Sequence, residues 1–188
     1  MRICVYCASS RTADAEYRIA AARLGRLLAE AGCELVYGGS SVGSMGALAD
    51  GALQAGGRVI GVLPRFMADR EWGHTGLTHL ELVEDMRERK HKLLTGSDAV
   101  VALPGGCGTL EELMEAITLK RLGLYNNPII LLNTRGFYRP LQVLLTHMID
   151  ERFMEPAHAG LWRMVDQPDQ VLSVIRDESA GALRKPRA

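Results

Sequence analysis

The sequence has no net charge, because its 22 lysines and arginines are matched by 22 aspartates and glutamates. A chain without an overall positive field has no long-range attraction for DNA, RNA or an anionic membrane surface. We therefore expect neither a nucleic-acid partner nor a membrane partner. Any recognition of a phosphate group must come from a local arrangement of residues.

Long apolar runs are also missing, and no segment approaches the roughly 20 residues that a membrane-spanning helix needs. A strand-like segment follows Met1 directly, which leaves no room for a signal peptide, so we expect a cytoplasmic protein. The 188 residues, 47% of them hydrophobic, suffice for one buried core. We predict a single domain over residues 1–178 and a flexible tail over residues 179–188.

Cysteines are few, and the four present are scattered through hydrophobic segments. A chain of this size does not need disulfides, so we expect reduced cysteines. Cys4 and Cys7 match C-x-x-C, but they fall within a predicted strand, where positions three apart point to opposite faces. A role in the core is therefore favoured. The five histidines show no metal-ligand spacing, and we predict no metal and no cofactor.

Strand-like and helix-like segments alternate along the chain. Strands are predicted at residues 2–8, 33–37, 58–63, 81–83, 99–103, 128–133 and 161–165. Helices are predicted at residues 14–31, from the glycine turn 38–46 to about 55, at 85–95, from 110 onward, and at 136–150 and 168–177. Residues 65–80 interrupt the alternation as a functional or disordered loop.

This alternation predicts an α/β fold with a doubly wound, mostly parallel sheet flanked by helices. In such sheets, ligands bind at the carboxyl ends of the strands, where the strand order reverses. Three turns follow predicted strands: Ser9-Ser10, residues 38–46 and residues 104–109. We expect these turns to line one crevice.

The segment from Leu103 to Glu112 reads LPGGCGTLEE and joins an apolar strand to a charged helix through three glycines. The start of a helix presents unpaired N–H groups and the positive end of the helix dipole, and glycines let the backbone approach a ligand closely. The segment predicts a cradle for a monophosphate. Its spacing matches neither the dinucleotide fingerprint nor a Walker A loop.

Spacing alone leaves alternatives open for the charged residues near this segment. Thr109 and Glu112 match a capping box, in which both side chains serve only the helix N-terminus. Arg89 and Lys90 fit the solvated face of a helix of mixed charge. However, Glu112 would also face the sugar of a nucleotide whose phosphate lay in the cradle, so two roles compete for the same side chain.

Two potential nucleophiles also stand out. Residues 39–43 match G-x-S-x-G between a strand and a helix, which allows an ester hydrolase with Ser41 as nucleophile and His147 or His158 as base. Cys107 at a helix start would have enhanced reactivity. No histidine lies near Cys107 in the sequence, so a packing or lid-contact role is favoured.

Two motifs together resemble the signature of a known family. Residues 85–90, DMRERK, and residues 104–112, PGGCGTLEE, are similar to the paired signature of the Lonely Guy family. Its members are cytokinin riboside 5′-monophosphate phosphoribohydrolases, often mislabelled as lysine decarboxylases. The resemblance covers nearly the whole chain. Lysine decarboxylation would need pyridoxal phosphate bound to a lysine, and nothing in the sequence identifies such a lysine.

The resemblance implies a Rossmann-like fold, no cofactor, a nucleoside monophosphate as substrate and a homodimer with active sites near the interface. It makes Arg89 and Glu112 the catalytic pair. Substrate or phosphate contacts are implied at Glu71, Met86, Lys90, Gly105, Gly106, Gly108, Thr109, Glu111, Thr118, Ser9, Gly39 and Gly43. Departures from the family pattern are Cys107, where an aromatic is usual, Arg87, where histidine is common, and Ser40 and Ser44.

The chemistry of such a site follows from charge. Cleavage of an N-glycosidic bond develops positive charge on the ribose, which a carboxylate such as Glu112 stabilises while it orients water. Arg89 would either hold Glu112 ionised and aimed or bind ribose hydroxyls. We expect a hydrolase that releases free base and ribose 5-phosphate from a cytokinin or adenosine nucleotide. The alternatives are a non-catalytic nucleotide or pterin-cofactor carrier of the same fold and the Ser41 hydrolase.

Overall fold

The computed structural model describes residues 1–68 and 73–183. Its strands form one seven-stranded parallel sheet in the order β4-β3-β2-β1-β5-β6-β7. The strands are β1 (Arg2–Tyr6), β2 (Glu34–Tyr37), β3 (Arg58–Pro64), β4 (His79–Val83), β5 (Ala99–Ala102), β6 (Ile129–Leu132) and β7 (Arg163–Val165). The strand order reverses between β1 and β5, which is where a doubly wound sheet forms its ligand crevice.

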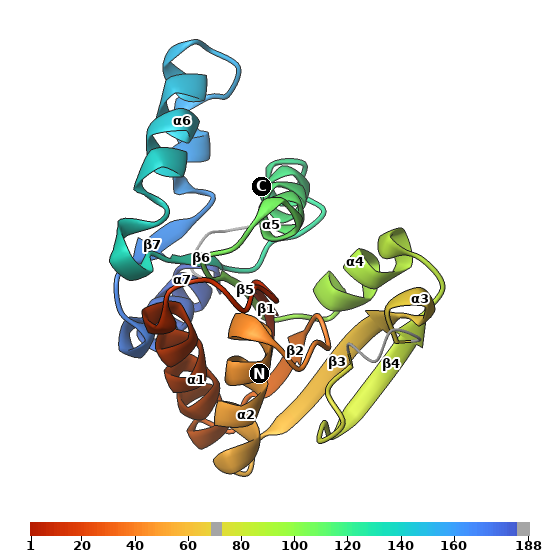
Figure 1. Cartoon of the computed structure of the whole chain (residues 1–188). Helices are drawn as coiled ribbons and strands as arrows, with labels where there is room; N and C mark the ends of the chain where they lie inside the picture. The colour runs from red at the N-terminus through yellow and green to blue at the C-terminus, as the bar shows by residue number, and fades with distance from the viewer. Residues whose placement is uncertain (69–72, 184–188) are drawn as a thin grey trace.

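Helices cover both faces of the sheet (Figure 1). One face carries α1 (Ala15–Glu30), α2 (Gly43–Gln54) and α7 (Val171–Leu183). The other carries α4 (Met86–Leu94), α5 (Cys107–Arg121) and α6 (Arg139–Asp150). Shorter helical turns are α3 (Arg65–Ala68), η1 (Thr134–Gly136), η2 (Pro156–Gly160) and η3 (Pro168–Gln170). These layers confirm the predicted doubly wound α/β fold.

The core has two halves, one on each face of the sheet. Along β1, Ile3 and Val5 pack with α1 and α2, whereas Cys4 packs with α4 and α5 on the opposite face. Cys7 belongs to the first half, so Cys4 and Cys7 lie on opposite faces, and both are buried and free. The prediction that this C-x-x-C pair belongs to the core is confirmed.

Two glycines let α1 and α2 pack closely. A Cβ added to Gly25 would overlap the backbone carbonyl of Leu48, and a Cβ added to Gly51 would overlap that of Ala22. The helices can therefore meet at this distance only without side chains at these positions. The start of α2 lies against the loop after β1, because the backbone N–H of Met45 donates to the carbonyl of Ala8 at 3.0 Å.

Three segments differ from the predicted elements. Residues 65–80, predicted as a loop, contain α3 and the beginning of β4, while residues 69–72 lie outside the described part of the chain. α5 begins at Cys107, earlier than predicted, because Gly106 adopts an extended conformation and serves as its N-cap. α7 continues past Asp177 to Leu183, in keeping with the helix propensity of the alanines there.

Within residues 1–68 and 73–183, none of the helices combines the length and apolar character needed to cross a bilayer.

Candidate active site

A pocket of about 340 Å³ opens beside the carboxyl ends of β1 and β5. It is lined by Cys7, Ala8, Ser9 and Ser10 after β1, Met45 of α2, Met86 and Arg89 of α4, Gly106 directly before α5, and Gly108, Thr109 and Glu112 of α5. The pocket therefore brings together the three turns that were expected to share a crevice. It lies where the strand order reverses, the usual ligand position in such sheets.

The N-terminus of α5 forms one wall of this pocket. Gly106 is the N-cap, and no side chain caps the helix. The first-turn N–H groups have no partner within the helix and are available to an anion. Added Cβ atoms on Gly106 and Gly108 would meet nothing within 4 Å, whereas one on Gly105 would overlap the side chain of Thr109. Gly105 therefore makes room for Thr109, which is buried in the pocket wall.

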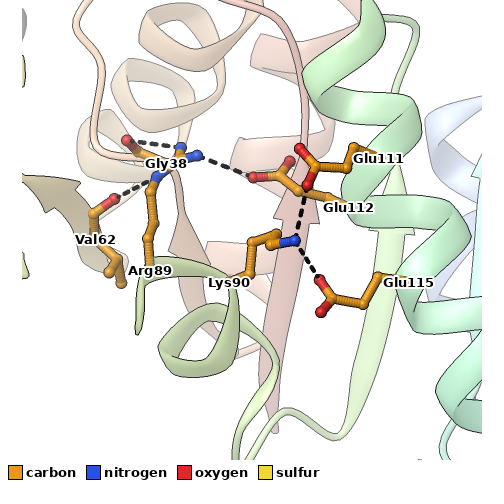
Figure 2. A network of polar contacts seen from close by, with 7 residues as sticks. All are labelled: Gly38, Val62, Arg89, Lys90, Glu111, Glu112 and Glu115. Carbon is orange, nitrogen blue, oxygen red and sulfur yellow. Dashed lines mark hydrogen bonds and ion pairs between the residues drawn. The ribbon is translucent and has the colours of Figure 1, made fainter. Parts of the chain in front are cut away.

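The structure contradicts the capping box predicted for Thr109 and Glu112. Because α5 starts at Cys107, Thr109 is its third residue and Glu112 its sixth, beyond the reach of the N-terminus. The Glu112 side chain points instead toward Arg89 (Figure 2). Glu112 therefore does not cap the helix, although its spacing from Thr109 matches a capping box.

Arg89 and Glu112 form a buried ion pair. Arg89 Nη1 donates to Glu112 Oε1 at 3.0 Å, and the two residues are only 6% and 5% exposed. Arg89 Nε also donates to the carbonyl of Val62 at 3.1 Å, and Nη2 to that of Gly38 at 3.3 Å. Figure 2 shows the guanidinium held between β2, β3 and α5. Arg89 is therefore an interior residue, and the interpretation of a solvated helix face is wrong for it.

The start of α4 determines where Arg89 points. The Asp85 side chain accepts the backbone N–H of Glu88 and caps the helix. Met86 and Arg89 are three positions apart and so share one face of α4. Both line the pocket as a result.

Burial raises the pKa of Glu112 to about 7, while the nearby positive charge of Arg89 lowers it. Burial has the larger effect, so Arg89 offsets only part of the desolvation of the carboxyl group. At neutral pH, Glu112 is therefore poised between its protonated and ionised forms. Such a group can take up and release a proton during a reaction.

Lys90 lies beside this pair but faces a different space. Its Nζ pairs with Glu111 at 2.8 Å and with Glu115 at 3.3 Å, which joins α4 to α5 (Figure 2). The hydrogen bond to Glu111 is the main cause of the raised pKa of Lys90. Lys90 and Glu115 line a separate groove of about 680 Å³ between α4, α5 and the segment after α5.

The residues implied as substrate contacts fall into two groups. Ser9, Met86, Gly106, Gly108 and Thr109 line the pocket together with Arg89 and Glu112. The pocket is not lined by Lys90, Gly105, Glu111, Thr118, Gly39 or Gly43, and Glu71 lies outside the described residues.

Three members of the second group have other clear positions. Gly39 and Gly43 have φ values of +79° and +63°, which favour glycine, so they shape the turn between β2 and α2. Thr118 is exposed on the face of α5 that also carries Glu111 and Glu115. None of these three residues lines the pocket.

Several features of the site were missed by sequence reasoning. Cys7 and Ala8 line the pocket beside the expected Ser9-Ser10 turn, and the signal for them was their position at the end of the first strand. Met45 belongs to the turn 38–46 that was expected to line the crevice, although no residue of that turn but Gly39 and Gly43 was named as a contact. The carbonyl groups that hold Arg89 had none at all, because any residue type supplies a backbone acceptor.

The alternative nucleophile Ser41 lacks a base among the described residues. Ser41 is exposed and shares a shallow pocket with His74. His74 Nε2 lies 3.0 Å from Asp50 Oδ1, and its other ring nitrogen accepts a backbone N–H, so both nitrogens are engaged. His147 lies on α6 and His158 in η2, which belong to the opposite half of the sheet order. Nothing in this arrangement forms a triad.

Comparisons with known proteins identify the family. The family model described as "possible lysine decarboxylase" matches residues 45–175. A cytokinin riboside 5′-monophosphate phosphoribohydrolase of Rhodococcoides fascians is 44% identical over 82% of this chain and 79% of its own length. A protein of the same name from Arabidopsis thaliana is 41% identical, over 82% of this chain and 73% of its own.

A solved structure, the molybdenum cofactor carrier protein of Chlamydomonas reinhardtii, has a TM-score of 0.74 and 23% identity, and covers 95% of this chain and 98% of its own. At this level of identity the likeness shows a common fold alone. The sequence relatives go further, because their identity extends over most of both chains. The chain belongs to the Lonely Guy family, which the "possible lysine decarboxylase" model describes and whose curated relatives are named phosphoribohydrolases.

Proposed function

We propose that the chain hydrolyses the N-glycosidic bond of a cytokinin or adenosine nucleoside 5′-monophosphate and releases free base and ribose 5-phosphate. One observation carries the proposal: a buried Arg89–Glu112 pair shares a pocket with the uncapped N-terminus of α5. This places a reactive carboxyl group beside a site for an anion. Relatives that are 44% and 41% identical carry the name of this activity.

The N-terminus of α5 would hold the 5′-phosphate. The N–H groups of its first turn and the hydroxyl of Thr109 are donors, and Gly106 and Gly108 leave the backbone accessible. Ser9 would contribute a further hydroxyl from across the pocket. The phosphate does not react, so these contacts supply binding energy that fixes the ribose near Glu112.

Glu112 would act on the ribose and on the attacking water. As the C1′–N bond breaks, its electron pair leaves with the base and positive charge develops on the ribose, which the carboxylate stabilises. Water adds to C1′ and loses a proton to Glu112, while the departing base takes up a proton from solvent. A pKa of about 7 lets Glu112 accept that proton at neutral pH and then release it to solvent.

Arg89 would aim this carboxylate. Three of the five N–H donors of a guanidinium are already used by Glu112 and two backbone carbonyls. The arrangement favours the aiming role over the binding of ribose hydroxyls, because the side chain is anchored on the protein side.

We also propose that the chain works as a homodimer, as a single nucleotide-binding domain in the cytoplasm. Exposed apolar side chains support an assembly: Leu124 after α5 is 73% exposed, and Val143 and Leu144 on α6 are 69% and 49% exposed. α6 projects from the body of the fold in Figure 1. A partner could also bring further contacts to the exposed Thr118. The four free cysteines fit a reducing compartment.

Base release from AMP and from isopentenyladenosine monophosphate tests the proposed reaction. We expect Glu112→Ala to lower kcat by about 10²- to 10⁴-fold with the circular dichroism spectrum retained. Glu115→Gln is the matched control, because Glu115 lies on the same helix outside the pocket. If the wild type releases no base from any monophosphate but keeps a ligand through purification, the non-catalytic carrier replaces the hydrolase.

A further inference from the structure

Gly38, the residue after β2, holds Arg89 in two ways: its carbonyl oxygen binds the guanidinium, and its lack of a side chain leaves space for it. Its carbonyl oxygen accepts Arg89 Nη2 at 3.3 Å. A Cβ added to Gly38 would overlap that same nitrogen and would lie 2.9 Å from the Cε atom of Met45. The backbone of Gly38 does not lie in the left-handed region. The glycine is therefore required here by space and not by conformation.

We propose that Gly38 is a positioning residue for the reaction: the absence of a side chain there lets the Arg89 guanidinium lie against the end of β2, from where it aims Glu112 into the pocket. This inference rests on the proposed function, because it places Gly38 behind the same catalytic pair. Gly38 itself does not line the pocket, so it acts only through Arg89.

An alanine at position 38 separates function from folding. The atoms that its Cβ would meet are the far ends of the Arg89 and Met45 side chains, which can move. At Gly25 and Gly51, in contrast, an added Cβ would meet backbone atoms that cannot yield without shifting a helix. Alanine at position 38 therefore leaves the fold intact and moves Arg89 and Met45, both of which line the pocket.

Displacement of Arg89 changes the electrostatic surroundings of Glu112 in a known direction. Arg89 is the largest influence that lowers the pKa of Glu112. The other groups around this carboxyl are Lys90 of α4, Glu111 and Glu115 of α5, Cys4 and Tyr6 of β1, and Cys7 directly after β1. Lys90 already pairs with both glutamates, and burial keeps the two cysteines and Tyr6 neutral. None of them replaces Arg89, so the pKa of Glu112 rises when Arg89 moves away.

The kinetic test compares Gly38→Ala with Gly160→Ala. Gly160 is exposed, has space for a Cβ and lies outside the left-handed region, so it is a matched control far from the pocket. With AMP as substrate, we expect Gly38→Ala to lower kcat by about 100-fold, the effect of a small misplacement of a catalytic group. KM should change little, because the cradle of α5 is untouched. The acid limb of the pH–rate profile should move to higher pH.

A second measurement does not depend on activity. The pKa of the Glu112 carboxyl group can be followed by ¹³C NMR in wild type, Gly38→Ala, Arg89→Met and the double variant. We expect Gly38→Ala to raise this pKa in the wild-type background and to leave it unchanged once Arg89 is gone. Thermal unfolding of Gly38→Ala should stay cooperative, with a midpoint no lower than that of Arg89→Met, because the variant disturbs only the buried contacts of Arg89.

The outcomes separate the positioning role of Gly38 from the proposed hydrolase function. An unchanged Glu112 pKa in Gly38→Ala, or an equal rise with and without Arg89, overturns the positioning role. An unfolding midpoint for Gly38→Ala below that of Arg89→Met would overturn it as well, because Gly38 would then support the fold beyond its contact with Arg89. If the pKa behaves as expected but the wild type releases no base, the proposed function fails while the positioning of Glu112 by Gly38 through Arg89 stands.

Discussion

At Glu112, burial and the neighbouring Arg89 act on the pKa in opposite directions, and burial prevails. A carboxyl group on the surface beside an arginine would be fully ionised at neutral pH. Here the side chain is only 5% exposed, and its pKa of about 7 follows from that enclosure. Arg89 orients the Glu112 side chain, because Arg89 is itself held in place by hydrogen bonds to two backbone carbonyls.

The raised pKa predicts an unusual pH dependence of stability. Glu112 has an ordinary pKa of 4.5 when unfolded and about 7 when folded, so between these values the folded state binds more protons. Linkage then makes the free energy of unfolding fall as the pH rises through this interval, by at most about 3 kcal/mol. Glu112→Gln does not titrate and lacks this contribution. Urea unfolding of both proteins at pH about 5 and about 8 checks the difference.

Glu30→Gln serves as the control in this comparison, because Glu30 is exposed at the end of α1 and is not among the groups that shift the pKa of Glu112, so it should leave the wild-type pH dependence in place. Parallel pH dependences for wild type and Glu112→Gln would mean that the carboxyl group is not desolvated in solution. In the same samples, kcat should rise with pH through about 7, since the ionised form accepts the proton from water.

Thr109 offers a prediction about the phosphate. Thr109→Val keeps the shape of the side chain and removes the hydroxyl donor from the pocket wall. We expect KM for AMP to rise about tenfold, the usual cost of one hydrogen bond to a charged group. The value of kcat should be nearly unchanged, because Arg89 and Glu112 keep their contacts. Steady-state kinetics, with ribose 5-phosphate as a competing inhibitor, measure both; a fall in kcat with no change in KM contradicts the phosphate role.

At the scale of elements, the first residue of α5 decides the chemistry of the site. The helix starts at Cys107 with an extended Gly106 as N-cap, so the N–H groups of its first turn lie beside the pocket without a capping side chain. If the helix had started three residues later, at Leu110, Thr109 and Glu112 would have capped it and closed the anion site. α4 contributes Arg89, the partner of Glu112. Its N-terminus is capped by Asp85, and Arg89 lies on the face of α4 that lines the pocket.

The contact between α1 and α2 should tolerate added side-chain atoms poorly. A Cβ on Gly51 would overlap the backbone carbonyl of Ala22, which cannot move without separating the helices. Gly51→Ala should lower the free energy of unfolding by about 1 to 3 kcal/mol, the typical cost of overpacking. Thermal unfolding measures the loss against Gly160→Ala. Equal midpoints for the two variants would show that the helices separate more easily than the packing indicates.

At the scale of the whole molecule, the sheet order places the site. β1 and β5 are neighbours although they lie far apart in the sequence, and the loops after them face each other across the pocket. α2 and α4 approach from opposite faces of the sheet and add Met45 and Arg89. The pocket therefore depends on the topology, because its walls come from elements that are far apart in the sequence.

The proposed homodimer is tested by sedimentation velocity at micromolar concentration. We expect the wild type to sediment as a dimer, and Val143→Asp combined with Leu144→Asp to shift it toward monomer, because these exposed side chains on α6 would no longer gain from burial. Ile19→Asp on α1 is a control of similar exposure on the other face of the sheet. A wild type that sediments as a monomer removes the dimer from the proposal.

The sequence by itself determined the α/β class, the positions of all seven strands and the glycine-rich turn beside the site. These features are local: period, turn residues and apolar runs act over a few residues, so they can be predicted without knowing the fold. Even the grouping of three turns at one edge followed from the general rule for parallel sheets.

Only the tertiary structure decided the state of Glu112. From spacing alone, Glu112 fitted a helix-capping role and Arg89 fitted the solvated face of a helix. Both patterns are common in exposed helices. Arg89 is held by partners 23, 27 and 51 positions away in the sequence, two of which are backbone carbonyls. Such contacts leave no mark in residue types or periods. They arise only when α4, α5, β2 and β3 pack together, and that enclosure is what raises the pKa of Glu112 to about 7.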